Sequence, residues 1–148
     1  MLLQYVAAMK ALRFRTQANG LDAILGELER PIMEAVWAGG EVSVTAVSAS
    51  LSGNPAYTTV KTVMERLERK GLLTRARQGR AFLYCAAIGR DALQGAASRQ
   101  VIEGLMSAFG SAALTQFAQV VREDPARLRE LRDLLNSVPD DDLPGGGR

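Results

Sequence analysis

The clearest pattern in the chain is an amphipathic helix over residues 57–70. Its apolar positions Val60, Met64 and Leu67 recur at the i, i+4, i+7 spacing of one helical face. Gly71 follows and can end the helix in a left-handed conformation. Short hydroxyl side chains near the helix start, with cations further along, suit a groove of DNA. The polar face holds Thr58, Lys61, Thr62, Glu65, Arg66 and Arg69.

Two short strands are predicted directly after this helix. Residues 72–77 and 81–86 flank the tight turn Gln78-Gly79-Arg80, which indicates a β-hairpin. Between residues 55 and 90 there are eight lysines and arginines but only two glutamates, a net charge of +6, whereas the whole chain carries +2. A helix followed by a basic hairpin is typical of the functional half of a winged helix-turn-helix.

Two further helices are predicted before the amphipathic one. The first spans residues 28–37, where Pro31 falls in the opening turn and is tolerated because the first N–H groups of a helix have no internal partner. Ser43 is a favourable N-cap for the second, over residues 44–51. Glu41-Val42 between them is expected to add a third short strand to the hairpin.

The segment after the hairpin has a different character. Apolar residues at every fourth position predict a helix from Asp91 to Phe109, with a second helix over residues 113–122 and a third beginning at Asp124-Pro125. Three short helices can hardly bury this much apolar surface alone. We expect them to pair with a second copy of the chain, and the alternative is that they fold back on their own winged helix. The expected dimer contacts are Leu93, Val101, Leu105, Phe109, Leu114, Phe117, Leu128, Leu131 and Leu135.

Together these patterns predict a mainly α protein with a small β-hairpin wing. A winged helix-turn-helix DNA-binding domain is expected over residues 25–88, followed by a helical dimerisation segment over residues 89–138. Residues 1–24 are expected to be an N-terminal extension, either disordered or a basic amphipathic arm, and residues 139–148 a disordered tail. No apolar run reaches the ~18 residues of a spanning helix. We therefore expect a cytoplasmic protein without membrane insertion.

The composition argues against an enzyme. The chain has no histidine, which removes the commonest general base and the most frequent zinc ligand. Its single cysteine, Cys85, cannot form an intramolecular disulfide or a cysteine-rich metal site, which agrees with a reducing compartment. We expect no catalytic residue, no metal site and no cofactor.

Several stretches between residues 25 and 86 together match a known pattern. They are residues 25–30 with Trp37, residues 56–60 with Thr62, Arg66-Leu67 with residues 70–72, and residues 79–82 with Tyr84. Through these stretches the chain resembles the BlaI/MecI repressors of β-lactamase and penicillin-binding-protein genes. The resemblance implies a homodimer bound to an inverted-repeat operator, control of β-lactamase or cell-wall stress genes, and induction by a membrane-embedded zinc protease that senses β-lactam. In the family the scissile bond precedes a phenylalanine of the dimerisation segment, and the matching pair here is Gln116-Phe117.

DNA contacts are assigned by their position on the predicted elements. Base contacts fall on Tyr57, Thr58, Lys61 and Thr62, because one helical turn brings them to the same side. The phosphate candidates are Thr59, Arg66, Arg75, Arg77 and Arg80.

Alternatives remain for two of these residues and for the function. Arg66 can instead belong to a solvated helix face with Glu65 and Glu68 as partners, and Tyr57 can cap the core. The competing function is a winged-helix repressor that a small molecule releases from DNA. A winged helix used for protein assembly is a third reading, although it would not need the basic hairpin.

Overall fold

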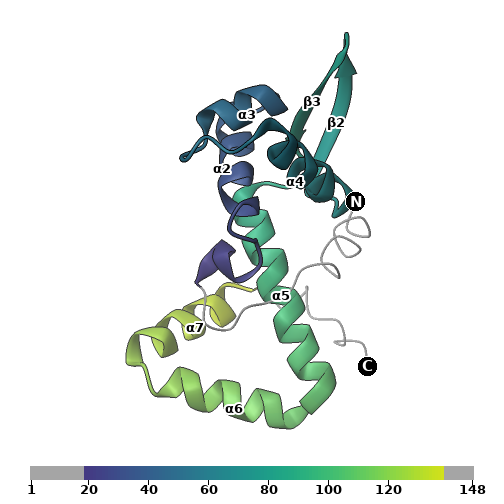
Figure 1. Cartoon of the computed structure of the whole chain (residues 1–148). Coiled ribbons are helices and arrows are strands. Elements are labelled where there is room, and N and C mark those ends of the chain that lie inside the picture. Colours follow the sequence, from purple (N-terminus) through teal and green to yellow (C-terminus); the bar gives the residue numbers. More distant parts are fainter. Residues whose placement is uncertain (1–18, 139–148) are drawn as a thin grey trace. The chain divides into compact units, whose positions relative to one another are not determined.

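The computed structural model describes residues 19–138 and shows a mainly helical chain with one three-stranded sheet (Figure 1). The predictions for residues 1–18 and 139–148 lie outside this range. The chain divides into two compact units after Val101. The elements are η1 (Gly20–Ala23), α2 (Glu29–Gly39), β1 (Val42–Ser43), α3 (Val44–Ser50), α4 (Tyr57–Arg69), β2 (Leu73–Gln78), β3 (Ala81–Ala86), α5 (Arg90–Phe109), α6 (Ser111–Arg122) and α7 (Pro125–Ser137).

Local signals in the sequence fix the ends of several helices. The Ser43 hydroxyl accepts a hydrogen bond from the Ala46 N–H at 3.1 Å and caps α3. The Asp124 carboxylate accepts one from Ala126 at 2.9 Å and caps α7, with Pro125 in the first turn. Gly71 has φ 79° directly after α4, as the left-handed cap requires. These predictions are confirmed, and most helix bounds differ from expectation by one or two residues.

The sheet has the strand order β1-β3-β2 and is antiparallel throughout. Tyr84 of β3 lies opposite Val42 on one side and Arg75 on the other. The predicted third strand is therefore present. Strands β2 and β3 run on past β1 as a two-stranded hairpin, which closes at Gly79 with φ 62°.

The core of the first unit lies between α2, α3, α4 and the sheet. The apolar face predicted for α4 is buried, with Val60, Met64 and Leu67 each 0% exposed. It packs in one cluster with Ile32 and Met33 of α2, with Val47 of α3 and with Leu73 and Tyr84 of the sheet. Because one face of α4 is fixed against this core, its other face must point to solvent. Trp37 is half-buried and its indole N–H donates to the Ile88 carbonyl at 2.9 Å, so α2 is joined to the chain just after β3.

The structure corrects the expected domain boundaries at residues 24 and 88. Leu21, Ala23 and Ile24 are buried, and Leu21 and Ile24 join the core cluster, so the domain begins before residue 25. Leu93 and Ala97 join the same cluster, so the first turns of α5 also belong to this unit. Leu93 is 0% exposed and was wrongly assigned to the dimer contact. The buried side of α5 is used within the chain.

The second unit contains the end of α5 together with α6 and α7, and α6 packs against α7. Among its described residues Val121 is buried, whereas many large apolar side chains are between 40% and 65% exposed. These side chains are Ile102, Leu105, Met106, Phe109, Leu114, Phe117, Val120, Leu134, Leu135 and Val138. Val101, Leu128 and Leu131 are half-buried.

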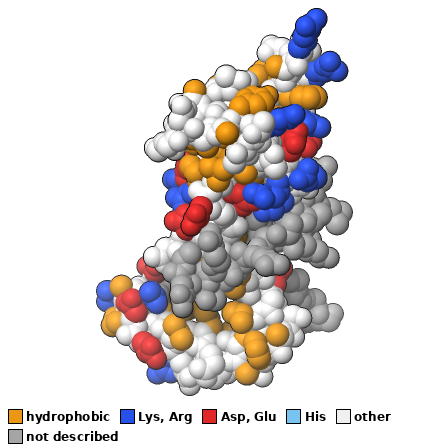
Figure 2. Space-filling model, in the orientation of Figure 1, with side chains coloured by type: hydrophobic (Ala, Val, Ile, Leu, Met, Phe, Trp, Pro, Cys, Tyr) orange, Lys and Arg blue, Asp and Glu red, His pale blue; other side chains and the backbone are white. Residues whose placement is uncertain are grey.

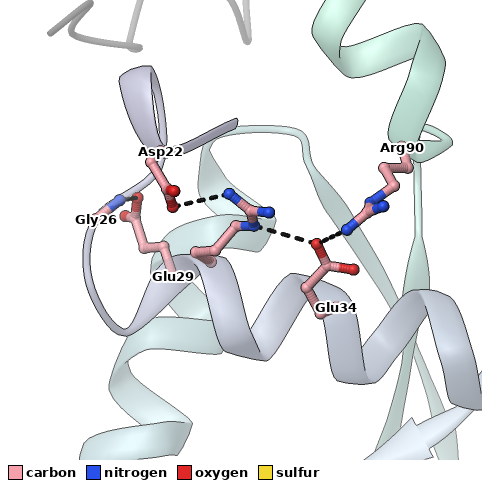
Figure 3. Close-up of polar contacts among 6 residues, drawn as sticks. Asp22, Gly26, Glu29, Glu34 and Arg90 are labelled. Carbon is pink, nitrogen blue, oxygen red and sulfur yellow. Dashed lines mark hydrogen bonds and ion pairs between the residues drawn. The ribbon is translucent and has the colours of Figure 1, made fainter. Parts of the chain in front are cut away.

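One buried carboxylate joins the start of α2 to the end of α4. Glu29 is 5% exposed and accepts hydrogen bonds from the Gly26 N–H at 3.0 Å (Figure 3) and from Lys70 Nζ at 2.7 Å. Arg66 Nε lies 3.3 Å from the same oxygen that Lys70 contacts. Burial alone raises the pKa of Glu29, but the hydrogen bonds from Gly26 and Lys70, with the charges of Lys70 and Arg66, hold it below its ordinary value.

A second set of ion pairs lies on the surface beside this carboxylate. Arg30 contacts Asp22 at 2.8 Å and Glu34 at 3.1 Å, and Arg90 at the start of α5 contacts the same Glu34 oxygen (Figure 3). The hydrogen bond from Arg90, and then that from Arg30, lowers the pKa of Glu34. These side chains are largely solvated, so each pair adds little to stability.

The Glu29→Gln variant should lower the free energy of unfolding by about 2 kcal/mol at neutral pH, because it leaves Lys70 and Arg66 without their shared anion. Urea unfolding followed by circular dichroism measures this. Glu34→Gln is the matched control on the same helix, and its loss should stay below about 1 kcal/mol. Equal losses in the two variants would contradict the importance given to the buried carboxylate.

The Glu29 contribution should also depend on pH. A carboxyl group with a lowered pKa in the folded state stabilises fully above its ordinary pKa of 4.5, and this stabilisation is lost as the pH falls through the lower folded value. The difference between wild type and Glu29→Gln should therefore be constant near neutrality and should close in acid. A difference that widens below pH 4.5 would show that the sign is wrong.

Candidate nucleic-acid interface

The exposed face of α4 carries all four residues that were predicted to contact bases. Thr58, Lys61 and Thr62 are exposed, and Tyr57 is 50% exposed, which removes the alternative that Tyr57 caps the core. Thr59 is also exposed. The first two turns of α4 thus present hydroxyl groups, one aromatic ring and one ammonium group to solvent.

The turn before α4 fixes how this face begins. Gly53 and Asn54 both have positive φ, 78° and 48°, and asparagine is among the few non-glycine residues that take this conformation readily. The Ser48 hydroxyl donates to the Pro55 carbonyl at 2.8 Å and joins α3 to the turn. Ala56 supplies no side-chain cap, so the positive end of the α4 dipole is not offset there by a side-chain acceptor.

A concavity of about 270 Å³ lies between α4, the start of α3 and the hairpin. It brings Tyr57 and Lys61 of α4 together with Arg80 of the hairpin turn, residues that the sequence assigned separately to bases and to phosphates. The lining is Ser43, Val44, Thr45, Tyr57, Lys61, Glu65, Arg80, Ala81, Phe82 and Tyr84.

Sequence reasoning assigned no DNA contact to the other members of this concavity, among them Ser43, Thr45 and Phe82. Ser43 was identified as a helix cap, which it is, but a cap at the end of β1 also lies beside β3 because the two strands pair. Thr45 follows it in the first turn of α3. The only signal for Phe82 was its neighbour Arg80, since an aromatic residue on a strand is normally taken as core.

The hydroxyl donor of Thr62 is already used in a hydrogen bond within α4. Its hydroxyl donates to the Thr58 carbonyl one turn back at 2.9 Å. A hydroxyl has one donor and two acceptor positions, so Thr62 offers a ligand its acceptor lone pairs and its methyl group. For Thr58 no such bond is found among the described residues.

The arginines predicted to contact phosphates differ in how free they are. Arg66 pairs with Glu29 and not with Glu65 or Glu68, so it is held toward α2. Arg75 lies 3.7 Å from Glu68, and its guanidinium is 4.5 Å from the centre of the Phe82 ring. The Tyr84 hydroxyl, and then the charge of Glu68, raises the pKa of Arg75, which therefore stays charged.

The positive charges nearest the hairpin turn are less compensated by neighbouring carboxylates than those of Arg66 and Arg75. Arg77 Nε donates to the Gly79 carbonyl at 3.2 Å, and within residues 19–138 no ion pair involves Arg77, Arg80 or Arg69. Lys61 is only loosely paired, 3.9 Å from Glu65. Figure 2 shows Lys and Arg side chains at the tip of the hairpin and on the body beneath it. The uncompensated positive charge is thus concentrated where the hairpin and α4 meet.

A larger hollow of about 640 Å³ lies elsewhere on the first unit, between α2 and α3. Its two charged lining residues, Arg30 and Glu34, are already paired with each other and with neighbouring charges. No described side chain in this hollow therefore offers an unpaired charge to a small ligand.

The predicted cleavage pair lies within a helix. Gln116 and Phe117 belong to α6, and the Phe117 side chain is 49% exposed. Gly110, with φ 55°, separates α6 from α5.

Residues 19–138 contain neither a candidate metal site nor a candidate membrane-spanning helix. In this part of the chain no three His, Cys, Asp or Glu side chains lie where they could together hold a metal ion. Across the same residues, none of the helices combines the length and the apolar character that crossing a bilayer needs.

The chain is similar to known DNA-binding regulators. The transcriptional regulator BlaI of Mycobacterium tuberculosis, in strains CDC 1551 and H37Rv, is 38% identical over 109 residues, which cover 69% of this chain and 77% of the relative. Two solved structures are more distant. The homodimeric winged helix-turn-helix domain of Mb0332 from Mycobacterium bovis has a TM-score of 0.42 and 24% identity, over 70% of this chain and 82% of that one. Bordetella bronchiseptica BpsR, whose DNA binding is regulated by 6-hydroxynicotinic acid, has a TM-score of 0.41 and 19% identity, over 91% and 84% of the two chains.

The family comparison covers most of the chain. The model of the penicillinase repressor family matches residues 25–137, which include the sheet and helices α2 to α7 but not η1. Together with the identity to BlaI, this match confirms the resemblance that the sequence motifs indicated. The chain therefore belongs to the penicillinase repressor family of DNA-binding transcriptional repressors.

Proposed function

We propose that this repressor binds an inverted-repeat operator as a homodimer, with α4 in the major groove of each half-site and the β2–β3 hairpin against the backbone. The observation that carries this proposal is the concavity in which Tyr57 and Lys61 of α4 meet Arg80 of the hairpin. A helix that exposes hydroxyl groups beside such a cluster of cations matches what duplex DNA offers, namely base edges flanked by phosphates.

The two kinds of contact fall on different elements. Thr58, Lys61 and Thr62 lie on one side of α4, where they can approach base edges together. Thr62 approaches as an acceptor and through its methyl group, which favours an amino group or a thymine methyl as its partner. Arg77 and Arg80 lie at the hairpin turn and have no ion-pair partner among the described residues, which suits phosphates.

Replacing Thr62 by alanine should reduce the preference for operator over random DNA by about 1 to 3 kcal/mol, the size of one good base contact. Binding is measured by fluorescence anisotropy, with the operator taken as a duplex that the wild-type protein selects from a random-sequence pool. Thr62→Ser and Thr62→Val then separate the methyl group from the acceptor oxygen.

Arg80→Ala is the matched control for this experiment. It should weaken binding to operator and random DNA alike and should lower the salt slope by about 0.9, the value of one phosphate contact. If Thr62→Ala keeps full discrimination, the assignment of the base-contacting face is wrong.

Dimerisation is supported by the apolar surface of the second unit. Five large apolar side chains of α5, α6 and α7 are each at least 49% exposed, namely Phe109, Leu114, Phe117, Leu134 and Leu135. So many exposed apolar side chains on neighbouring helices mark a contact surface. A second copy of the chain is the occupant that the family and an inverted-repeat operator both favour. When two DNA-binding units are joined in a dimer, binding of the second half-site becomes intramolecular.

The Phe109→Glu variant should be a monomer, because it places a charge on the most exposed aromatic side chain of this surface, 62% exposed. Analytical ultracentrifugation measures the mass, and anisotropy compares one half-site with the full operator. The variant should keep the half-site affinity and lose the additional affinity for the full operator, by about a hundredfold.

Gln119→Glu adds the same charge to an exposed polar position of α6 and should remain dimeric. A Phe109→Glu protein that sediments as the wild-type dimer would exclude this surface as the dimer contact.

Induction completes the proposed function. We infer that the repressor controls β-lactamase or cell-wall stress genes from the cytoplasm and is inactivated when a membrane-embedded metalloprotease causes cleavage between Gln116 and Phe117. Cleavage there would cut α6 in the middle and separate α7 from the DNA-binding unit. A peptide bond within a helix is accessible only after local opening, and Gly110 next to α6 supports such opening.

Exposure of the native host to a β-lactam should produce a fragment that ends at Gln116, detected by mass spectrometry of the repressor. Phe117→Ala is the test variant and should give no such fragment, because it removes the aromatic side chain after the scissile bond while alanine is compatible with the helix. Thr115→Ala is its neighbour control. Release of the operator while the chain stays intact would rule out this route and favour a bound ligand.

A further inference from the structure

Phe82 is an exposed aromatic residue that the core does not use. It is 40% exposed, whereas Tyr84, two residues later on β3, is 1% exposed. The core cluster contains Tyr84 but not Phe82. A large apolar ring held partly in water near the tip of a basic hairpin needs another explanation than packing within the chain.

The strand register shows which way this ring points. Alternate residues of a strand lie on the same face of a sheet, so Phe82 shares the face of Tyr84. Directly opposite residues share a face too, and Phe82 lies opposite Arg77 as Tyr84 lies opposite Arg75. Tyr84 points into the core, so Phe82 continues the inward face of the hairpin beyond the edge of the core. There it lines the concavity with Tyr57 and Lys61 of α4.

The ring is held in place by a neighbouring arginine. The Arg75 guanidinium lies 4.5 Å from the ring centre, a cation–π contact, and Arg75 also lies 3.7 Å from Glu68. This leaves the remaining surface of the ring open to the concavity. Phe82 thus adds an apolar surface to a concavity that the cations Lys61 and Arg80 also line.

We propose that Phe82 contacts duplex DNA through an apolar surface of the nucleic acid, either the 5-methyl group of a thymine or the face of a deoxyribose. This inference rests on the proposed DNA-binding function and adds a residue to it. The cations that line the same concavity, Lys61 and Arg80, complement the phosphates that flank both apolar groups. Phosphate contacts alone would give no reason for an aromatic side chain at this point, whereas methyl groups and sugars are the apolar features that a duplex presents.

A purely local role for the ring predicts a different result. If Phe82 only holds Arg75 in place for a phosphate, its loss should remove one ionic contact and lower the salt slope of binding by about 0.9. If it contacts DNA through its own apolar surface, its loss should weaken binding and leave the salt slope unchanged.

The experiment compares full-length wild type, Phe82→Ala, Phe82→Leu and the control Gln78→Ala, which changes an exposed side chain on the opposite face of the hairpin. Affinity for the duplex selected by the wild type is measured over a series of salt concentrations. Phe82→Ala should bind roughly tenfold more weakly with the wild-type slope. Phe82→Leu should recover part of the loss, and Gln78→Ala should bind as the wild type does.

A second arm identifies the apolar partner on the DNA. Deoxyuridine replaces each thymine of the duplex in turn, which removes only the methyl group. A single substitution that weakens the wild type but not Phe82→Ala identifies a thymine methyl as the partner. If no substitution distinguishes the two proteins while Phe82→Ala still binds more weakly, the deoxyribose is the partner.

Two results would overturn the proposal. One is Phe82→Ala binding with wild-type affinity, and the other is a slope that falls by about 0.9, which would reduce the ring to a support for Arg75. Thermal unfolding of each variant shows that the hairpin persists, and Phe82→Leu provides the test if Phe82→Ala unfolds. Failure of the proposed function itself would look different, because the wild type would then show no salt-dependent binding to any duplex.

Discussion

The buried carboxylate of Glu29 is the constraint on which the DNA-binding unit depends. Apolar side chains hold α2 and α4 together, but apolar contacts are not directional and allow neighbouring helices to slide. The Glu29 oxygens add direction, because they accept from the Gly26 N–H at one end and from Lys70 at the other. Lys70 immediately precedes the left-handed Gly71 that leads into β2. The same ion pair thus fixes α4 against α2 and fixes the point at which the chain turns into the hairpin.

This arrangement also sorts the cations of the unit into two groups. Arg66 and Lys70 lie toward the end of α4 and share the single negative charge of Glu29. Lys61 near the start of α4 and Arg80 at the hairpin turn keep most of their charge for a partner. The net charge of the stretch therefore overstates what DNA would meet. Part of the remaining charge, that of Lys61, lies in the first turns of α4, where the hydroxyl side chains are exposed.

Much of the first unit could be predicted because its signals are local. The apolar spacing on α4, the Ser43 cap and the glycine turns depend on residues a few positions apart, and each appears where the sequence placed it. The predictions that failed concern contacts between residues far apart in the sequence. No residue close to Leu93 in the sequence indicates that this side chain packs into the core of the first unit. The partner of Arg66 is likewise distant in the sequence, since Glu29 lies 37 positions away, whereas the sequence indicated a DNA phosphate or, as the alternative, the nearer Glu65 and Glu68.

The indole of Trp37 is an intrinsic fluorescence probe of this molecule. It is the chain's one tryptophan, and its N–H is bonded to the Ile88 carbonyl, between the end of β3 and the start of α5. Its emission should therefore respond when the first unit loosens at that junction. Helices α6 and α7 contain neither tryptophan nor tyrosine, so their melting is silent in fluorescence and visible only in the far-ultraviolet dichroism. Comparing tryptophan fluorescence with far-ultraviolet dichroism would reveal whether the first unit and helices α6 and α7 unfold together or separately.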